Sequence, residues 1–195
     1  MSDRPAPDAA ALVLASRSPQ RSAILQQLGI VFEVVPADID ELNAGDPVEV
    51  ARANALAKAD AVAGTRPGAT VLGVDTIVTC DGDILGKPAS AGVAERTLRR
   101  LSGRTHAVIS GLALLRSANA QVVHEVTEVT FRELDDELVR RYVRTCEWSG
   151  RAGGYAIQHK GASLVRAVRG DYLNVVGLPV AALLDLDLSL MLMEC

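Results

Sequence analysis

Apolar positions along the chain recur first at strand spacing and then at helix spacing, which predicts strands and helices in alternation. The short apolar runs at 11–16 and 31–37 are typical of buried strands. Between them, Ser18 and Pro19 supply a helix N-cap and a first-turn proline, apolar residues follow at helical spacing, and Gly29 ends the helix. The first part of the chain therefore predicts a strand, a helix and a second strand.

The next stretch predicts a long helix followed by a hairpin. Asp46 as N-cap, Pro47 in the first turn and Glu49 at the third position have the spacing of a capping box, and the alanine-rich helix that they open ends near Gly64. Residues 71–88, "VLGVDTIVTCDGDILGKP", then predict an apolar strand, a tight turn at "DGD" and a second short strand.

The rest of the chain alternates helices with long apolar runs. We expect, in chain order, a helix at 90–101 closed by Gly103, an antiparallel hairpin of the runs 105–115 and 121–131, a helix at about 135–145, a Gly-rich loop at 149–165, a turn at Gly170 and Asp171, and a last helix from Pro179. Short βα units combined with long hairpins favour an α/β domain with a mixed, strongly twisted sheet flanked by helices over an all-parallel sheet.

Composition narrows the classes of partner. The chain of 195 residues is long enough for a real core, and we expect a single domain over 11–195 after a disordered tail at 1–10. Aromatic residues are only 3% of the sequence, which disfavours stacking platforms for nucleic acid. The net charge of -4 disfavours a broad basic surface, so a phosphorylated ligand would have to meet a local cluster of lysine and arginine.

Cysteine usage and hydropathy bear on the cell compartment. Cys80, Cys146 and Cys195 are odd in number, far apart and without a CxxC pair, so neither a disulfide framework nor a zinc site is indicated. No apolar run is long enough to cross a membrane, and the N-terminal segment lacks the apolar core of a signal peptide. We therefore expect a reduced, cytoplasmic protein without a membrane partner.

Asp75 is the residue that the predicted strand explains least. Strand alternation places it on one face with Gly73 and Ile77, so an ionisable group lies between neighbours suited to burial. A buried carboxylate is costly without a cation, a metal or a hydrogen-bond network beside it. Gly73 would let a ligand approach the backbone, and the hairpin would bring Lys87 into the same cleft. We therefore favour a functional role for Asp75.

The start of the first helix is a candidate anion site. Ser16, Ser18 and Arg21 crowd a position where free backbone N–H groups and the helix dipole favour a phosphate. The alternative is an ordinary N-cap with a surface arginine.

Acidic and basic residues further along are weaker candidates when each is taken alone. Asp38, Asp40 and Glu41 follow a predicted strand end and would supply the oxygen ligands that Mg²⁺ prefers, or else form a solvated acidic loop. Lys58 lies on the alanine-rich helix, where a surface lysine is the ordinary interpretation.

Other polar residues carry less information. His106, His124 and His159 lack metal-ligand spacing, and we interpret them as surface or strand residues. Tyr155 and Gln158 in the Gly-rich loop would either hydrogen-bond a base edge or stabilise the loop.

Taken together, these stretches resemble the Maf family of nucleoside triphosphate pyrophosphatases, from Leu12 to about Leu184. The likeness rests, in order, on "LASRSPQRSAILQQLGI", "ADIDE", "ALAKADAVA", "LGVDTIV" with "ILGKP", "LSGRTHAVISGLAL", "EVTFREL", "GGYAIQHKGASLV" and "GDYLNVVGLP". Each is weak alone, and their order and spacing together are specific. The resemblance implies a bilobed fold with a central cleft, of the Maf and inosine triphosphatase type.

The resemblance also implies an activity and a set of roles. The expected reaction cleaves a nucleoside triphosphate between the α and β phosphates with Mg²⁺ or Mn²⁺, giving the monophosphate and pyrophosphate. The implied roles are phosphate binding for Ser16, Ser18 and Arg21, metal binding for Glu41 and Asp75, neutralisation of phosphate charge by Lys58 and Lys87, and activation of water by Asp75.

The positions that tune the base in this family fall on Gln20, Thr76 and Gln158. Thr76 and Gln158 match members that hydrolyse dTTP and UTP, whereas Gln20 stands where those members usually carry arginine. In addition, Arg17 replaces a usual small residue, and Arg151 is the only part kept of a common Asp-Lys pair.

Two alternatives therefore stand beside a dTTP/UTP pyrophosphatase. One is a pyrophosphatase for 7-methyl-GTP or another noncanonical nucleotide, and the other is a nucleotide-binding regulator of cell division without turnover. Related proteins are often dimers, so a homodimer is an expected partner beside the triphosphate.

Overall fold

The computed structural model describes residues 12–117 and 119–191, and the expected tail at 1–10 lies outside them. Its elements in chain order are β1 (Leu12–Leu14), α1 (Pro19–Gln27), β2 (Phe32–Val34), α2 (Pro47–Ala63), β3 (Thr70–Cys80), β4 (Asp83–Leu85), α3 (Ala91–Leu101), β5 (Thr105–Arg116), β6 (Asn119–Phe131), α4 (Asp136–Val143), β7 (Val165–Arg169), α5 (Tyr172–Val176) and α6 (Val180–Leu186). Three short 3-10 helices are η1 (Ala152–Gly154), η2 (Lys160–Leu164) and η3 (Leu188–Met191).

One mixed sheet organises the fold, as the sequence predicted. The strand order is β2-β1-β3-β5-β6-β7, and β4 pairs with β3 to complete seven strands. β1 runs parallel to β2 and β3, whereas β3, β5, β6 and β7 are antiparallel to their neighbours. The two expected hairpins are therefore confirmed, β3 with β4 and β5 with β6.

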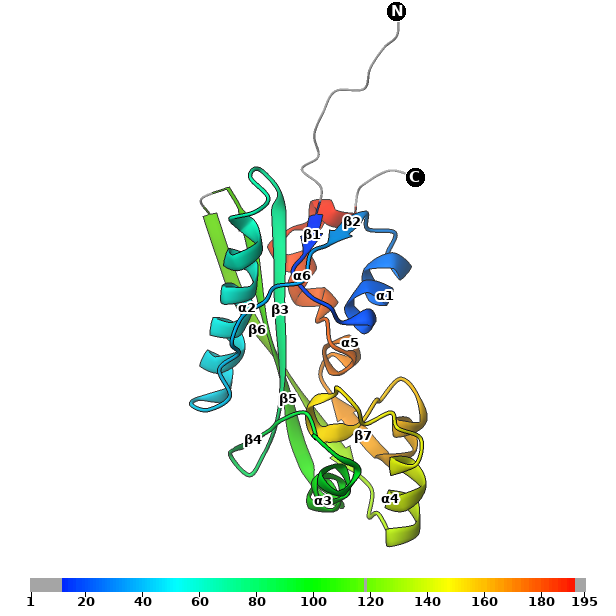
Figure 1. Cartoon of the computed structure of the whole chain (residues 1–195). Coiled ribbons are helices and arrows are strands. Elements are labelled where there is room, and N and C mark those ends of the chain that lie inside the picture. Colours follow the sequence, from blue (N-terminus) through cyan, green and yellow to red (C-terminus); the bar gives the residue numbers. More distant parts are fainter. Residues whose placement is uncertain (1–11, 118, 192–195) are drawn as a thin grey trace, which may run out of the picture.

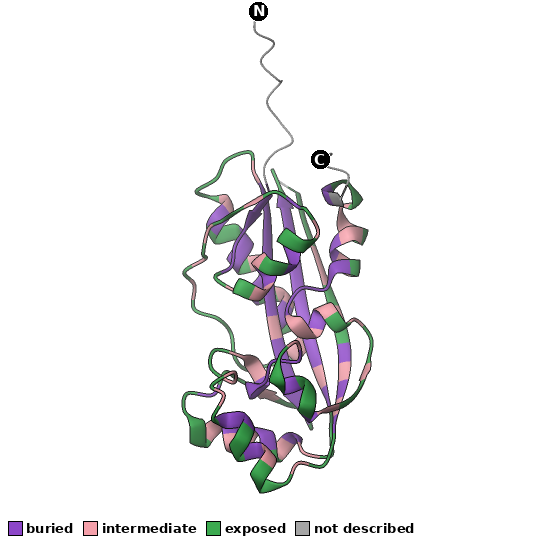
Figure 2. Ribbon diagram, turned by 90° about the vertical axis from the view of Figure 1, so that its right-hand side faces the viewer, coloured by how far each residue is buried: buried purple, intermediate pink, exposed green. Residues whose placement is uncertain are grey.

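Helices gather at the two ends of the long strands (Figure 1). At one end, α2 covers one face of the sheet while α1 and α6 cover the other. At the opposite end, α3, α4 and the Gly-rich segment enclose a second core that includes Leu101, Phe131 and Tyr142. The central strands that join the two halves are largely buried (Figure 2). The expected bilobed α/β architecture is thus observed.

α2 lies unusually close to the sheet, and two glycines allow it. A Cβ on Gly73 would lie 2.1 Å from the carbonyl oxygen of Ala55, and one on Gly111 would lie 2.2 Å from that of Ala51. Only a helix face of alanines opposite strand glycines permits this approach. The backbone that approaches Gly73 therefore belongs to α2, which corrects the expectation of a ligand there.

The predicted helix boundaries are confirmed where capping residues set them. The Ser18 hydroxyl accepts a hydrogen bond from the backbone N–H of Arg21, and Asp46 accepts bonds from Val48 and Glu49. The capping box itself is not completed, because the Glu49 carboxylate contacts Arg52 at 3.4 Å.

The C-terminal third contains elements that the sequence did not predict. The end of the expected Gly-rich loop continues into β7, which pairs with β6, and the expected turn at Gly170 leads into α5. β2 is also shorter than the expected strand at 31–37. Within residues 12–117 and 119–191, no helix has the length and apolar character needed to cross a bilayer.

Candidate active site

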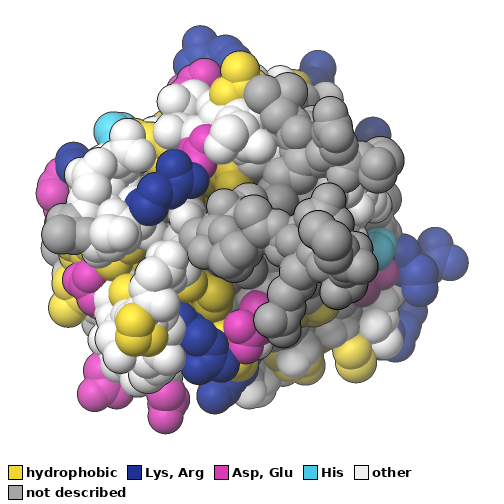
Figure 3. Space-filling view, turned by 90° about the horizontal axis from the view of Figure 1, so that it is seen from above, with side chains coloured by type: hydrophobic (Ala, Val, Ile, Leu, Met, Phe, Trp, Pro, Cys, Tyr) yellow, Lys and Arg dark blue, Asp and Glu magenta, His cyan; other side chains and the backbone are white. Residues whose placement is uncertain are grey.

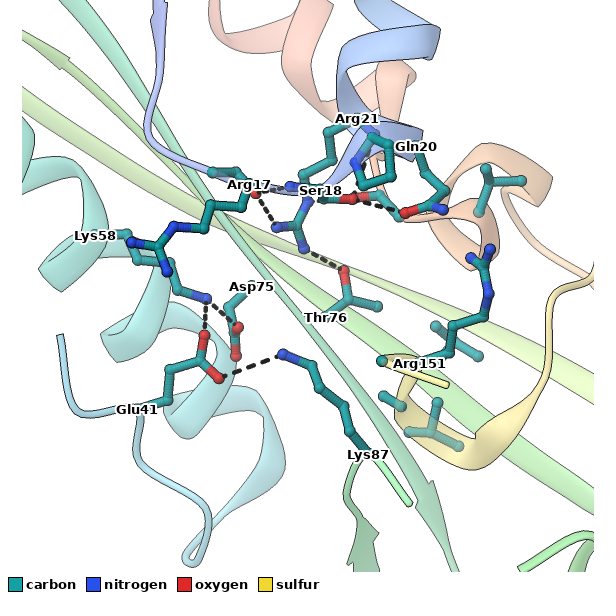
Figure 4. Close-up of a pocket in the computed structure, with 18 of the residues that line it drawn as sticks. Arg17, Ser18, Gln20, Arg21, Glu41, Lys58, Asp75, Thr76, Lys87 and Arg151 are labelled. Carbon is teal, nitrogen blue, oxygen red and sulfur yellow. Dashed lines mark hydrogen bonds and ion pairs between the residues drawn. The ribbon is translucent and has the colours of Figure 1, made fainter. Parts of the chain in front are cut away.

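A cavity of about 470 Å³ lies between the two halves of the molecule (Figure 4). Its walls come from the β1–α1 junction, the segment after β2, α2, β3, the segment after β4, the Gly-rich segment and the end of α5. The residues predicted for a site, which are distant along the chain, therefore meet in one cleft. Asp40 is an exception, because it is exposed and does not line the cavity.

Asp75 is buried in the floor of this cavity with the kind of partners that the sequence analysis required. Its side chain, only 6% exposed, projects from β3 toward α2. Lys58 Nζ lies 2.6 Å from Asp75 Oδ1, and Asn54 Nδ2 donates a hydrogen bond to Asp75 Oδ2 at 3.0 Å. Asn54 and Lys58 are one helical turn apart, so both reach the same carboxylate.

Lys58 is a buried bridge between two carboxylates. Its ammonium also contacts Glu41 Oε1 at 2.6 Å, and the residue is 7% exposed, so interpretation as a surface lysine is wrong. Lys87 approaches Glu41 Oε2 at 3.8 Å, and 58% of its side chain remains exposed. Two lysines and two carboxylates therefore form one chain of charges at this end of the cavity (Figure 4).

Asn54 also belongs to this cluster, although it was not among the predicted site residues. Its amide donates to the carbonyl of Leu42 at 2.9 Å and accepts from the Leu42 N–H at 2.8 Å. One side chain thus ties the segment that carries Glu41 to the carboxylate of Asp75. The available signal was its spacing of four residues from Lys58 on an otherwise alanine-rich face.

Arg21 is buried at the start of α1, and its three donor nitrogens are hydrogen-bonded. Nη1 donates to Ser16 Oγ at 2.8 Å, Nη2 to Thr76 Oγ1 at 3.1 Å and Nε to the carbonyl of Gly177 at 2.9 Å. Burial lowers the pKa of Arg21 from its ordinary value, although the charges of Asp75 and Glu41 oppose the shift. Arginine remains protonated under such a shift, so a fixed positive charge stands beside Ser16 and Thr76.

Gln20, another predicted residue, lies across the cavity from Glu41 and Asp75, beside Arg151 (Figure 4), whereas Ser18 stays next to Ser16, whose Oγ accepts a hydrogen bond from the Ser18 N–H at 3.2 Å. Ser18, Gln20 and Gln158 line the cavity together with Arg151 of the Gly-rich segment. Tyr155 also borders the cavity, but its hydroxyl is hydrogen-bonded to Nε2 of His106 at 2.8 Å. Burial raises the pKa of Tyr155 well above its ordinary value, and the contact with His106 directs this hydroxyl into the core, as expected for a residue that stabilises the loop.

The donor set suits a hard divalent cation only with the help of substrate. Among the described residues, no three His, Cys, Asp or Glu side chains converge at metal-ligand spacing. Glu41 and Asp75 do converge, because both contact the same ammonium. Mg²⁺ is commonly held by one or two carboxylates together with substrate phosphates and water, so this pair fits such an ion.

The cavity is locally basic although the chain is acidic. Its described lining includes the basic residues Arg17, Arg21, Lys58, Lys87 and Arg151 and the acidic residues Asp38, Glu41 and Asp75. On the described part of the face seen in Figure 3, by contrast, acidic and basic side chains are interspersed. A cluster with excess positive charge is the local feature that an anionic ligand requires in a protein of net charge -4.

Arg17 adds a cation that the sequence analysis noted only as a departure. Its side chain extends along the cavity wall toward Lys58, on the side of the carboxylates (Figure 4). No carboxylate of the described residues lies within 4.0 Å of its guanidinium. Arg17 is therefore available to an anion in the cavity.

Comparison with known proteins identifies relatives over almost the whole chain. A family described as Maf-like protein matches residues 11–188. A dTTP/UTP pyrophosphatase of Symbiobacterium thermophilum is 48% identical over 87% of this chain and 88% of its own. Proteins of the same name from Pelotomaculum thermopropionicum and Thermococcus gammatolerans are 45% and 47% identical, over 90% and 87% of this chain and 94% and 91% of theirs. With a match of this extent and a cleft in which the motif residues meet, the chain belongs to the Maf family.

Proposed function

We propose that the protein is a nucleoside triphosphate pyrophosphatase that hydrolyses dTTP and UTP between the α and β phosphates. The observation that carries the proposal is the buried carboxylate of Asp75, which Lys58 and Asn54 hold in the floor of a nucleotide-sized cavity. We call this end, where Glu41 also lies, the carboxylate end of the cavity. The names of the relatives support the choice of thymine and uracil nucleotides.

The charges of the cavity suit the triphosphate part of such a substrate. A triphosphate repels an incoming nucleophile, so hydrolysis requires cations that offset the charge of the phosphates and of the departing pyrophosphate. Lys87 and Arg17 are exposed to the cavity and would bind the phosphate oxygens directly. Arg21 and Ser16, in the cavity wall at the start of α1, would add positive charge and a hydroxyl donor for the phosphates.

Asp75 is suited to orient and deprotonate the attacking water. Each of its oxygens is engaged on one side, by Lys58 and by Asn54, which fixes the carboxylate plane. A carboxylate oxygen accepts more than one hydrogen bond, so each can still accept a proton from water. The product proton would therefore be held at Asp75 before its release.

Glu41 and Asp75 are the residues that would hold Mg²⁺ or Mn²⁺, with phosphate oxygens and water completing the shell. When bound, such an ion polarises phosphate oxygens and neutralises developing charge.

A panel of nucleotides tests the proposal. Canonical and modified triphosphates, including dTTP, UTP, CTP and 7-methyl-GTP, are incubated with Mg²⁺ or Mn²⁺ and scored for monophosphate and pyrophosphate. We expect product from dTTP and UTP above all others. Binding without product from any nucleotide would instead support a regulator without turnover, and preferred turnover of 7-methyl-GTP would support the noncanonical alternative.

Asp75→Asn tests the assigned base. A positioned general base contributes about 10²–10⁴-fold, so kcat should fall by that factor while nucleotide binding, measured by calorimetry, is largely kept. Asp60→Asn, which changes an exposed carboxylate on α2, the helix that carries Asn54 and Lys58, should leave kcat unchanged. Wild-type turnover in Asp75→Asn would remove Asp75 from this role.

A further inference from the structure

The end of the cavity away from the carboxylates holds an arginine that is fixed by neutral groups alone. Arg151 immediately precedes η1, and its side chain reaches into the cavity toward Gln20 (Figure 4). Its Nε donates to the carbonyl oxygen of Glu147 at 2.8 Å. Its Nη1 and Nη2 both donate to Oε1 of Gln20, at 2.9 and 3.1 Å.

Gln20 is held in turn by the cap of α1. In the orientation that gives these bonds, which is opposite to the one drawn in Figure 4, Nε2 of Gln20 donates to Ser18 Oγ at 3.0 Å. The drawn orientation would set the NH2 group against the guanidinium, donor against donor. A chain of hydrogen bonds therefore runs from Ser18 through Gln20 to Arg151 and joins the two walls of the cavity.

Arg151 retains donors for a ligand. A guanidinium has five N–H donors and no acceptor, and the bonds to Glu147 and Gln20 use three of them. No carboxylate of the described residues lies within 4.0 Å of the Arg151 guanidinium. Glu41 and Asp75 lie at the other end of the cavity (Figure 4). A full positive charge with two remaining donors therefore borders the cavity here.

We infer that Arg151, held by Gln20, binds a carbonyl oxygen of the nucleobase and so selects uncharged keto pyrimidines. This inference rests on the proposed function, because it takes the carboxylate end of the cavity as the site of the triphosphate. The neighbouring wall includes Ala152, Val175 and Val176, apolar residues that suit the face of a base.

The chemistry of the bases makes the selection specific. Uracil and thymine carry a carbonyl oxygen where cytosine carries an amino group, and an amino group facing the guanidinium would pair donor with donor. A site that hydrogen-bonds its substrate rejects an analogue that leaves the site's polar groups unpaired. The 7-methylguanine base carries a positive charge, so Arg151 also repels it.

The test compares UTP with CTP in three proteins: the wild type, Arg151→Met and Arg166→Met. Arg166 is an exposed arginine of β7 that does not line the cavity, so its variant is the matched control. Loss of a charged hydrogen bond should lower kcat/KM for UTP by about 10- to 100-fold in Arg151→Met and leave that for CTP nearly unchanged. Arg166→Met should behave as the wild type.

Equal losses for UTP and CTP would mean that Arg151 only shapes the loop, and this outcome overturns the inference. So does a wild-type kcat/KM for UTP in Arg151→Met. Either result leaves the proposed function intact, because both nucleotides are still hydrolysed.

A binding experiment separates the inference from turnover. Calorimetric titration of UMP and CMP should show that the wild type prefers UMP and that Arg151→Met has lost most of this preference. Gln20→Leu should lose part of it, and in the double variant the second substitution should add little, because the two side chains act as one unit. If no triphosphate is hydrolysed, the proposed function fails, while an absent UMP preference in the wild type overturns the inference by itself.

Discussion

Asn54 stabilises two parts of the candidate site with one amide. It contacts Asp75 on β3 and both backbone groups of Leu42, next to Glu41. Because its bonds hold Asp75 and the segment next to Glu41, we expect Asn54 to position these two carboxylates rather than to contact a substrate.

We expect Asn54→Ala to lower the free energy of unfolding by about 1–3 kcal/mol, since it leaves buried groups unpaired. The concentration of Mg²⁺ needed for half-maximal rate should rise, because Glu41 is no longer held. Urea unfolding and a metal titration measure the two effects. A loss of stability with an unchanged metal requirement would contradict the positioning role.

His106 makes stability depend on pH. It is 2% exposed between Phe131 and Tyr155, and burial lowers its pKa from 6.5 to about 4. Because the folded-state pKa is the lower one, the unfolded chain binds the proton first as the pH falls. The contribution of the neutral imidazole is therefore complete above pH 6.5 and is lost progressively down to about pH 4.

This contribution amounts to about 3 kcal/mol, at 1.36 kcal/mol per pKa unit. The free energy of unfolding should consequently fall more steeply between pH 7 and pH 4.5 in the wild type than in His106→Gln. Denaturant unfolding at a series of pH values measures the difference. His159→Gln, at an exposed position, should keep the wild-type slope. Parallel curves for all three proteins would refute the assignment.

At the level of strands and helices, patterns within one segment could be predicted, and contacts between segments could not. Caps at Ser18 and Asp46 located α1 and α2, because a cap acts within four residues. β7 and α5 are five residues each, too short to display a period, and β7 is stabilised by pairing with β6. In the site, the alternation of side chains along a strand was enough to single out Asp75 as a functional candidate. Asn54 could not be predicted in this way, because it contacts Asp75 only when α2 packs on β3.

The contact of α2 with the sheet gives a prediction of its own. Gly111 lies opposite Asp75 in the β3–β5 register. A Cβ added to Gly111 would lie 2.2 Å from the carbonyl oxygen of Ala51 on α2, which is too close for the two atoms to coexist. Gly111→Ala must therefore displace α2, which should lower the free energy of unfolding by about 1–3 kcal/mol and reduce kcat as Lys58 moves away from Asp75.

Gly92→Ala is the matched control, because a Cβ at this position of α3 would meet only Arg96 Nη1 at 3.7 Å. Its free energy of unfolding should change by no more than about 1 kcal/mol. Thermal unfolding measures the stability of both variants, and turnover assays measure their kcat. Equal stability of Gly111→Ala and the wild type would show that the close approach of α2 does not limit the fold.

The whole molecule should unfold in one step although it has two halves. Trp148, the single tryptophan, packs in the core of Leu101 and Phe131, and its indole N–H donates to the carbonyl of Val143 at 2.9 Å. Its fluorescence therefore reports one half, whereas far-UV circular dichroism reports both. Since β3, β5 and β6 extend through the two halves, the urea midpoints from both probes should coincide. Separate midpoints would mean that the halves unfold independently.

The same long strands limit how the cleft can adjust to a nucleotide. β3 and β5 stay paired without a break from Thr70 opposite Arg116 to Thr79 opposite Ala107, a range that includes the cavity residues Asp75, Thr76 and Val108. Hinge closure needs a few residues at loops or element ends that absorb the change in backbone angles, and an uninterrupted ladder supplies none. The strands under the cleft therefore act as a fixed floor, and any adjustment to a ligand must come from side chains and from the loop segments that line the walls.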